Sequence, residues 1–532
     1  MQLVAYGAQD VYLTGNPQIT FWKVTYRRHT NFAMESIEQT FNGQADFGRR
    51  VQCTVSRNGD LAYRTYLQVT LPEVCQENCC GTTEQDVYAR WLDYPGEQLI
   101  SMVEVEIGGQ RIDRQYGDWM HIWNQLTLTA EQEHGYNKMV GHTLQLTYLI
   151  DPSFADIESA CGGAGPAQTC APRKCLPETT LYVPLQFWFC RNPGLALPLI
   201  ALQYHEVRIN LELRPSDECL WAVSELDGTT GNKKMTAAYQ KSLVATSLYV
   251  DYVFLDTDER RRMAQNPHEY LIEQLQFTGD ESVGSSSNKI KLNFNHPCKE
   301  LVWVVQKDKN VDYCASFVGG QALYEALGAQ PFNYTDAYDA LPSSISAYAA
   351  EATVRGNGTT ERNTAFINST GLFEDAGAEE HTSNASSWAA YAANVKNKQD
   401  SGVSDAGAYV LAETALNMHC WGQNPVVTAK LQLNGQDRFS EREGTYFDLV
   451  QPYQHHTRSP DTGINVYSFA LRPEEHQPSG TCNFSRIDNA TLQLVLSANT
   501  VGDDNTAKVR VYATNYNVLR IMSGMGGLAY SN

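Results

Sequence analysis

The chain has 532 residues, of which 42% are hydrophobic and 19% charged, and its formal net charge at pH 7 is −20. This length exceeds what one compact core normally holds, so we expect two or three domains, and the composition excludes a mostly disordered chain. The negative charge argues against nucleic acid as a partner, because phosphate binding needs a basic surface.

Residues 1–18 are predicted to form an N-terminal arm, since glycines and an Asn-Pro turn leave little periodicity there. The arm lacks the basic start and apolar block of a secretory signal. The longest apolar run, residues 195–202, has eight residues, whereas a bilayer span needs about 20. We therefore expect a protein made in the cytosol, without a transmembrane segment.

Residues 19–215 are predicted to be a first β unit of many short strands, typical of a sandwich or barrel. Regular structure is expected to begin at Ile19, and the turn at Asn58-Gly59 predicts a hairpin. One helical patch is predicted within Tyr116–Val140, reaching at least as far as Leu128, because its apolar residues recur at spacings of three and four. These residues are Trp119, Ile122, Trp123 and Leu126.

A linker is predicted over residues 216–242, followed by a second β unit over 243–522 that starts with the β-branched and aromatic run at 243–255. Between about 308 and 416 the composition shifts to small and polar residues. A connection of this length is unusual within a compact domain, so we predict one exposed insertion. The glycine-rich residues 523–532 form a C-terminal tail.

Three short sequences recur in the same order in the two halves and indicate an internal repeat. The pairs are Ile37-Glu38-Gln39 with Ile272-Glu273-Gln274, Gly109-Gln110 with Gly435-Gln436, and the Pro–Gly turns at 192–194 and 478–480. The halves are therefore predicted to share a fold, with the insertion inside the second. A unit of about eight strands with long end loops fits a jelly roll, a doubled Greek key. The alternative is two unrelated β-sandwiches.

Long stretches of the sequence resemble the major capsid proteins of nucleocytoplasmic large DNA viruses, and the chlorella-virus (phycodnavirus) members in particular. The first of them reads GAQDVYLTGNPQITFWKVTYRRHTNFAMESIEQTFNG. The stretches that carry the resemblance are 7–43, 192–207, 254–279, 433–439, 477–492 and 515–530. Residues 76–80 and 161–175 and the core of 308–416 do not share it.

The resemblance implies an all-β chain of two consecutive eight-stranded jelly rolls with long loop insertions. It further implies a structural role, in which three copies form a pseudo-hexagonal capsomer of an icosahedral shell around a large double-stranded DNA virus. The expected partners are other copies, neighbouring capsomers, minor capsid proteins and covalent glycans, with an internal membrane below the shell. The expected location is the virion, after synthesis and assembly in the host cytoplasm.

Two other functions stay open from the sequence alone. One is a minor or vertex capsid paralogue with the same fold. The other is a carbohydrate-binding or carbohydrate-processing β-sandwich, which would need paired carboxylates or an aromatic platform.

Motifs of catalysis and cofactor binding do not support an enzyme. The sequence contains no H-E-x-x-H, G-x-S-x-G or P-loop pattern, so we expect no catalytic, cofactor or metal site. The tail from Gly524 to Ala529 fits a loose dinucleotide fingerprint but is interpreted as a flexible tail that packs against a neighbour. His455 and His456 are interpreted as an exposed loop pair rather than half of a metal site.

Six of the thirteen cysteines fall into two local clusters and are candidates for disulfides, with zinc binding and free thiols as the alternatives. These candidates are Cys75, Cys79, Cys80, Cys161, Cys170 and Cys175. Four glycosylation sequons lie in the predicted insertion, at Asn333, Asn357, Asn368 and Asn384. The run Arg260-Arg261-Arg262 is interpreted either as a solvated charged face or as a contact between subunits.

Overall fold

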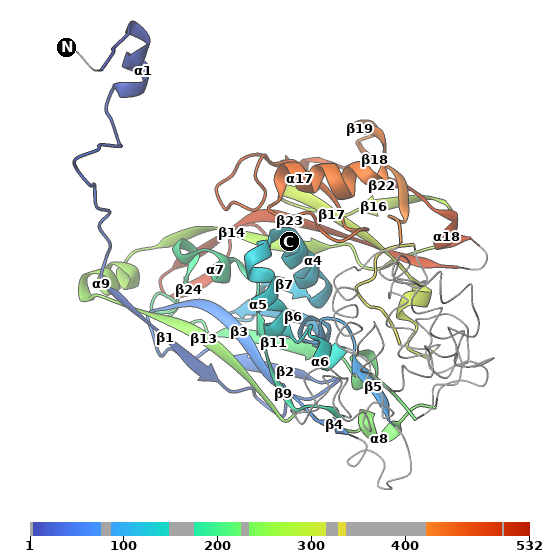
Figure 1. Cartoon of the computed structure of the whole chain (residues 1–532). Helices are drawn as coiled ribbons and strands as arrows, with labels where there is room; N and C mark the ends of the chain where they lie inside the picture. Colours follow the sequence, from blue (N-terminus) through green and yellow to red (C-terminus); the bar gives the residue numbers. More distant parts are fainter. Residues whose placement is uncertain are drawn as a thin grey trace, which may run out of the picture.

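The computed structural model of the chain describes residues 4–75, 87–147, 175–224, 233–314, 328–336, 422–502 and 505–531. Strands make up most of the regular secondary structure, and an arm at the N-terminus extends away from the body (Figure 1). Among the helices of these ranges, none is both long and apolar enough to span a bilayer.

The first jelly roll packs two sheets against each other. One has the strand order β1-β13-β3-β10, with β9 also paired to β3, and the other has the order β2-β11-β6-β7. Two short pairs, β5 with β12 and β4 with β8, extend it. The bounds are β1 (Phe32–Gln39), β2 (Arg50–Thr54), β3 (Leu61–Leu71), β4 (Val74–Cys75), β5 (Tyr88–Trp91), β6 (Ile100–Ile107), β7 (Gln110–Tyr116), β8 (Cys175–Leu176), β9 (Thr179–Pro184), β10 (Leu197–Pro198), β11 (Val207–Leu213), β12 (Leu220–Val223) and β13 (Ala245–Leu255).

The second jelly roll repeats the order of the four main strands in each of the two sheets. Its sheets have the orders β14-β23-β17-β20 and β16-β22-β18-β19. The shorter β15 and β24 add to β23, and β21 adds to β17. The bounds are β14 (His268–Phe277), β15 (Glu281–Val283), β16 (Ser287–Leu292), β17 (Pro297–Lys307), β18 (Val426–Leu433), β19 (Gln436–Glu443), β20 (Asn465–Ser468), β21 (Cys482–Asn483), β22 (Ala490–Leu496), β23 (Ala507–Met522) and β24 (Met525–Leu528). The predicted double jelly roll is confirmed.

The short sequences that indicated a repeat occupy equivalent places in the two rolls. Ile37 lies on β1 and Ile272 on β14, the edge strands of the corresponding sheets. The β6–β7 and β18–β19 hairpins each turn through two residues with positive φ, Gly108-Gly109 and Asn434-Gly435. Two-residue turns of this kind match the twist of antiparallel strands, and glycine or asparagine adopts them at little cost. The repeat is therefore structural as well as sequential.

Several sequence-based boundaries and turns differ from the structure. Ile19 does not begin a strand, because residues 19–31 form no strand and are almost all exposed, and the first strand starts at Phe32. The run 243–255 was placed in the second unit, yet β13 pairs with β1 and β3 and closes the first roll. Asn58-Gly59 joins β2 to β3, which lie in different sheets, and so forms no hairpin. The predicted linker contains β12, which pairs with β5.

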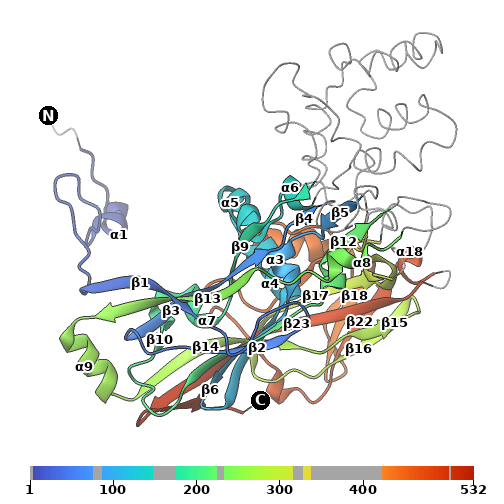
Figure 2. The ribbon, with the colours of Figure 1, turned by 90° about the horizontal axis from the view of Figure 1, so that it is seen from below.

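Helices are few and short in the described ranges, and those named here lie beside the sheets rather than in them (Figure 2). The predicted amphipathic helix is confirmed as α4. The main helices are α3 (Pro95–Leu99), α4 (Gly117–Thr127), α5 (Ala130–Val140), α7 (Trp188–Arg191), α8 (Thr236–Tyr239), α9 (Thr257–Gln265), α17 (Gln451–His455) and α18 (Ala498–Val501).

Strand β22 shows how the sequence pattern builds the core. Every second residue, from Ala490 to Leu496, is buried in the second roll, while Thr491, Gln493 and Val495 are partly exposed. A period of two places one side of a strand against the facing sheet. The alternation of apolar and polar residues in this stretch of sequence thus matches the alternation of buried and partly exposed side chains.

Gly117, the first residue of α4, packs closely against the backbone of the segment from Glu97 to Ile100. A substitution there tests this packing. A Cβ atom there would lie 2.2 Å from the carbonyl oxygen of Ile100 and 2.5 Å from that of Glu97. We expect Gly117→Ala to lower the free energy of unfolding by about 3 kcal/mol, because backbone must move to make room. Chemical denaturation measures this change.

Gly135, inside the exposed helix α5, provides the matched control. A Cβ atom there would meet nothing within 4 Å. Gly135→Ala should raise the free energy of unfolding by up to about 1 kcal/mol, because alanine restricts the unfolded chain. Equal effects of the two substitutions would contradict the tight packing at Gly117.

Candidate functional site at the junction of the two rolls

Helix α4 joins the rolls through its apolar face. Although α4 belongs to the first half of the chain, its side chains pack on the second roll's β17 and β23. Trp119 lies against Tyr512, with ring centroids 5.4 Å apart, and both side chains are buried. The cluster consists of Trp119, Ile122, Trp123 and Leu126 from α4 with Val302, Val304, Tyr334, Ile464, Val466 and Tyr512. Burial of this surface holds the rolls together.

Asp118, next to Trp119 on α4, links a cation from each roll. Its carboxylate lies 3.2 Å from Arg214, just after β11, and 3.2 Å from Arg510 on β23. Arg510 also bonds Asp280 at 2.8 Å. Although burial opposes the charge of Arg510, these acids raise its pKa above the ordinary value. The two arginines thus share one carboxylate across the junction.

Glu273 is the centre of a second cross-roll cluster. This carboxylate on β14 lies 2.7 Å from the buried ammonium of Lys299 and 3.3 Å from Arg191, which α7 of the first half supplies. Burial alone would raise its pKa, but a hydrogen bond with His476 and the charges of Lys299 and Arg191 hold it at about 2. The Arg191 guanidinium also lies 3.9 Å from the Trp123 ring centroid. Glu273 is therefore ionised and anchored to both rolls.

Asp113 on β7 hydrogen-bonds to the neighbouring edge strand, β14. Its carboxylate accepts the backbone N–H of Leu275 at 3.1 Å, and the Gln274 amide donates to the carbonyl of Ile112 at 2.5 Å. Burial raises the pKa of Asp113 to about 7, even though hydrogen bonds and the charge of Arg191 favour its ionised form. These bonds align β7 with β14 in a fixed register.

His455 and His456 differ from their interpretation as an exposed loop pair. His455 is partly exposed, but the His456 ring is buried between Glu300, 2.8 Å from Nε2, and Glu474, 2.9 Å from Nδ1. Burial opposes a charge on this ring, but the two carboxylates outweigh it and raise the pKa to about 9. His456 is a buried cation that ties β17 to the segment before the 478–480 turn.

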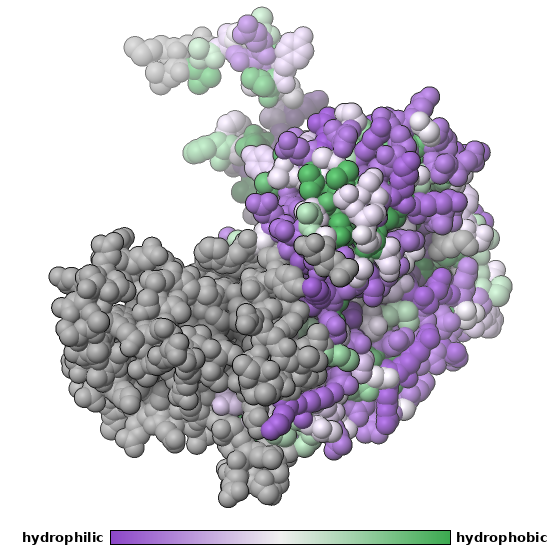
Figure 3. Space-filling view, turned by 90° about the vertical axis from the view of Figure 1, so that its right-hand side faces the viewer, coloured by the Kyte–Doolittle hydropathy of each residue, from purple (hydrophilic) through white to green (hydrophobic). Residues whose placement is uncertain are grey.

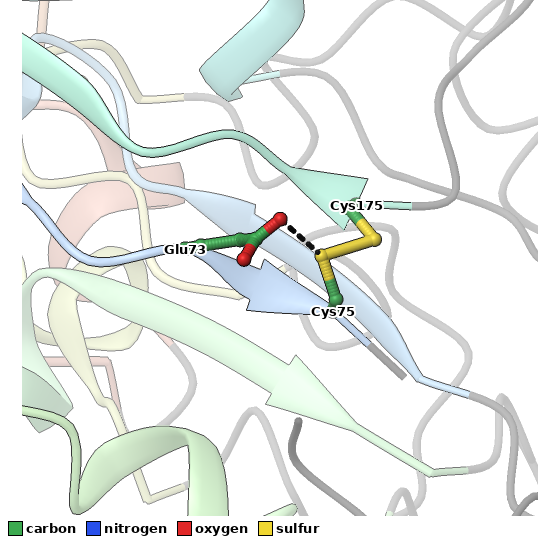
Figure 4. A group of neighbouring side chains, drawn as sticks. All are labelled: Glu73, Cys75 and Cys175. Carbon is green, nitrogen blue, oxygen red and sulfur yellow. Dashed lines mark hydrogen bonds between the residues drawn. A yellow bond between two sulfur atoms is a disulfide. The ribbon is translucent and has the colours of Figure 1, made fainter. Parts of the chain in front are cut away.

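Two of the candidate cysteines meet in the structure. Cys75 on β4 and Cys175 on β8 are joined by a disulfide, and the Glu73 carboxylate lies 3.1 Å from the Cys75 sulfur (Figure 4). These three groups lie within 4.8 Å of one another, as ligands of a metal ion would. Sulfurs bonded to each other do not act as two thiolate ligands, so the disulfide and a zinc site exclude one another here. Cys79, Cys80, Cys161 and Cys170 lie outside the described residues.

Asn333 is the one glycosylation candidate within the described residues; Asn357, Asn368 and Asn384 fall outside them. Its side chain is buried, donates to Gln330 at 2.7 Å and accepts from Thr335. A sugar on this nitrogen would replace a hydrogen bond and need space that the fold fills. Asn333 is therefore a poor acceptor.

The arginine run and the C-terminal tail, both considered as possible contacts with a neighbour, each contact their own chain. Arg260 of the arginine run bonds Asp60 at 3.0 Å, so part of this run holds α9 to the first roll. The C-terminal tail is ordered as β24, paired to β23, and its Gly524 carbonyl accepts the N–H of Tyr204. The tail thus packs on the first roll of its own chain, and the glycines of β24 lie in a strand, whereas a dinucleotide site would place them at the start of a helix.

Comparisons with known proteins agree with this architecture. The family described as large eukaryotic DNA virus major capsid protein matches residues 259–527, and the major capsid protein N-terminus family matches residues 20–256. The chain belongs to the major capsid protein family of large eukaryotic DNA viruses. The "Major capsid protein" of Phaeocystis pouchetii virus is 76% identical, over 100% of this chain and 99% of the relative. That of Paramecium bursaria Chlorella virus 1 is 39% identical over the same shares.

A solved structure extends the comparison to the fold. PBCV-1 VP54, fitted into a reconstruction of the virophage Sputnik, superimposes with a TM-score of 0.62 at 34% identity, covering 96% of this chain and 100% of VP54. The family resemblance is confirmed, and the chain is a structural protein of the viral capsid rather than an enzyme. The carbohydrate-processing alternative is therefore wrong.

The sequence alone does not identify the junction residues, apart from the apolar residues of α4 (Trp119, Ile122, Trp123 and Leu126). Glu273 is part of the repeated Ile-Glu-Gln, and that repetition was the available signal. Its partner Arg191 is 82 positions away, and no local pattern pairs residues at that distance.

Arg191 provides a direct test of the junction. We expect Arg191→Met to lower the free energy of unfolding by about 3 kcal/mol, because it leaves Glu273 short of a partner and removes the cation over Trp123. Arg208→Met is the matched control, since Arg208 and its partner Glu206 are exposed and 3.1 Å apart. The control should change stability by no more than about 1 kcal/mol. Equal losses in denaturation would contradict the role of Arg191.

His456 predicts a pH dependence. Its pKa is about 9 when folded and near 6.5 ordinarily, so its contribution is complete below pH 6.5 and is lost as pH rises through 9. This contribution amounts to about 3 kcal/mol. The stability difference between the wild type and His456→Gln should therefore shrink between pH 6.5 and pH 10. Gln454→Ala, at an exposed neighbour without a titratable group, should give a flat difference, and the same slope in both variants would refute the prediction.

Proposed function

We propose that three copies of the chain form a capsomer with six similar lobes, and that these capsomers tile an icosahedral shell. The observation that carries this proposal is the identical strand order of the two rolls. One chain thereby supplies two nearly equivalent lobes, and a threefold axis turns two lobes into six. The junction supports the proposal because lobes at a fixed angle are needed for regular tiling.

The wider setting of the shell follows from the family and is part of the same proposal. Neighbouring capsomers and minor capsid proteins are the partners, an internal membrane lies beneath the shell, and assembly takes place in the host cytoplasm. The insertion at 308–416, between β17 and β18, is proposed to carry glycans, with Asn357, Asn368 and Asn384 as acceptors. Glycopeptide mapping of particles that found this segment bare would overturn the glycan proposal.

The trimer is tested by light scattering after size exclusion. The purified chain should elute with three times its mass of 59.4 kDa. Particle imaging should then show capsomers with pseudo-sixfold outlines. A stable monomer at the concentrations of assembly would contradict the proposal, whereas the family membership would stand.

We propose that Cys75 and Cys175 are disulfide-bonded in the mature particle. Two thiols would lose two electrons and two protons to dissolved oxygen or a thiol oxidase, after the reducing cytosol no longer protects them. The bond closes a loop of sequence separation 100, which in the chain-entropy model stabilises by about 4.7 kcal/mol. Differential alkylation of released particles should label both cysteines only after reduction. Labelling without reductant would refute the bond.

A further inference from the structure

The N-terminal arm, which in the structure extends to residue 31, before β1, exposes large apolar side chains that its own chain does not cover. Phe21, Trp22 and Tyr26 have relative exposures of 101%, 86% and 83%. The hydrogen bonds of the arm connect its own residues, as between Thr20 and Lys23. In both ribbon views the arm leaves the body at the start of β1 and projects away from it (Figures 1 and 2).

The apolar surface of the arm continues onto β1. Phe32 and Met34 are exposed at the start of this strand. The strand β1 stands at the end of its sheet's order and pairs with β13. A sheet edge with exposed apolar residues is a surface at which another chain readily packs.

The arm differs in charge from the rest of the molecule. Residues 1–31 contain Lys23, Arg27 and Arg28 and one acid, Asp10, so they carry +2. Since the whole chain carries −20, residues 32–532 carry −22. Figure 3 shows apolar and hydrophilic residues mixed along the projecting arm, above a body surface that is mostly hydrophilic. The arm is thus a basic, aromatic segment attached to an acidic body.

The exposed aromatic rings and the opposite charges of arm and body indicate which partner the arm binds. Copies of a body with charge −22 repel one another, so their association needs contacts that offset this repulsion. A basic segment meeting an acidic surface supplies attraction, and its aromatic rings supply apolar burial. We propose that the arm docks on the acidic body of a second copy of this chain. The inference rests on the proposed self-assembly and names the segment that makes the contact.

Cross-linking of mixed isotopes tests the contact directly. Lys23 is the one lysine among residues 1–31. Equal amounts of ¹⁴N-labelled and ¹⁵N-labelled protein are mixed, dissociated, reassembled and treated with a carbodiimide, which joins an amine to a carboxylate. We expect peptides that link Lys23 to Asp or Glu of residues 32–532 and carry both labels. Lys23→Arg keeps the charge but should abolish these peptides.

Charge reversal tests the energetic contribution. Arg27→Glu with Arg28→Glu should weaken association about tenfold at low salt, and the effect should fade at high salt. Lys289→Glu with Lys291→Glu is the matched control, since these residues of β16 are exposed. Because the arm lies outside both cores, the arm variant should keep the melting temperature of the isolated chain.

The outcomes separate this inference from the trimer proposal. Oligomers that form without doubly labelled Lys23 links would overturn the arm contact and leave the trimer intact. Lys23 cross-links in which both peptides carry the same isotope would also overturn the arm contact. So would a control pair, Lys289→Glu with Lys291→Glu, that weakens association as much as the arm variant. Binding of the arm to anionic phospholipid vesicles without any link to a second copy would assign it to a lipid surface instead. A chain that stays monomeric would overturn both proposals.

Discussion

The burial of helix α4 against the second roll is the contact on which the rest of the structure depends. Three residues of the second roll, Ile272, Leu519 and Ile521, join the core of the first. Contacts within one roll alone would leave the angle to its neighbour free. Trp119 and Trp123 remove this freedom by packing on β17 and β23. A shell that repeats one building block many times requires such rigidity, because an angular error in each block would accumulate.

Ion pairs at the junction fix how the two rolls align across this apolar contact. Burying Asp118 or Glu273 costs solvation free energy, and the cations around each carboxylate offset that cost only when the rolls align. Exchanging such pairs for apolar residues often leaves net stability unchanged, whereas a misaligned pair is strongly unfavourable. The apolar stripe of α4 thus supplies affinity between the rolls, and the charges select one arrangement.

The sequence predicted what depends on local periodicity. The spacing of Trp119 to Leu126 identified α4, and the alternation of residues from Ala490 to Leu496 is likewise the burial pattern of β22. The double jelly roll followed from the repeat and the family resemblance. Pairing between strands was not predictable in this way: β13 looks like the start of a unit but completes the first roll. In a jelly roll successive strands often cross between sheets, so Asn58-Gly59, a hairpin signal elsewhere, joins two sheets here.

The two ends of the molecule differ in the short strands and helices that lie outside the main sheets. The β4, β5, β8 and β12 pairs lie at one end, and α9 and the start of β1 lie at the other (Figure 2). The connections from β3 to β6 and from β17 to β18 are both longer than the two-residue hairpin turns at β6–β7 and β18–β19. Sheet residues are constrained by the facing sheet, whereas these connections are not. A double jelly roll can therefore vary at one end while the sheets, the junction and the arm keep the geometry that assembly requires.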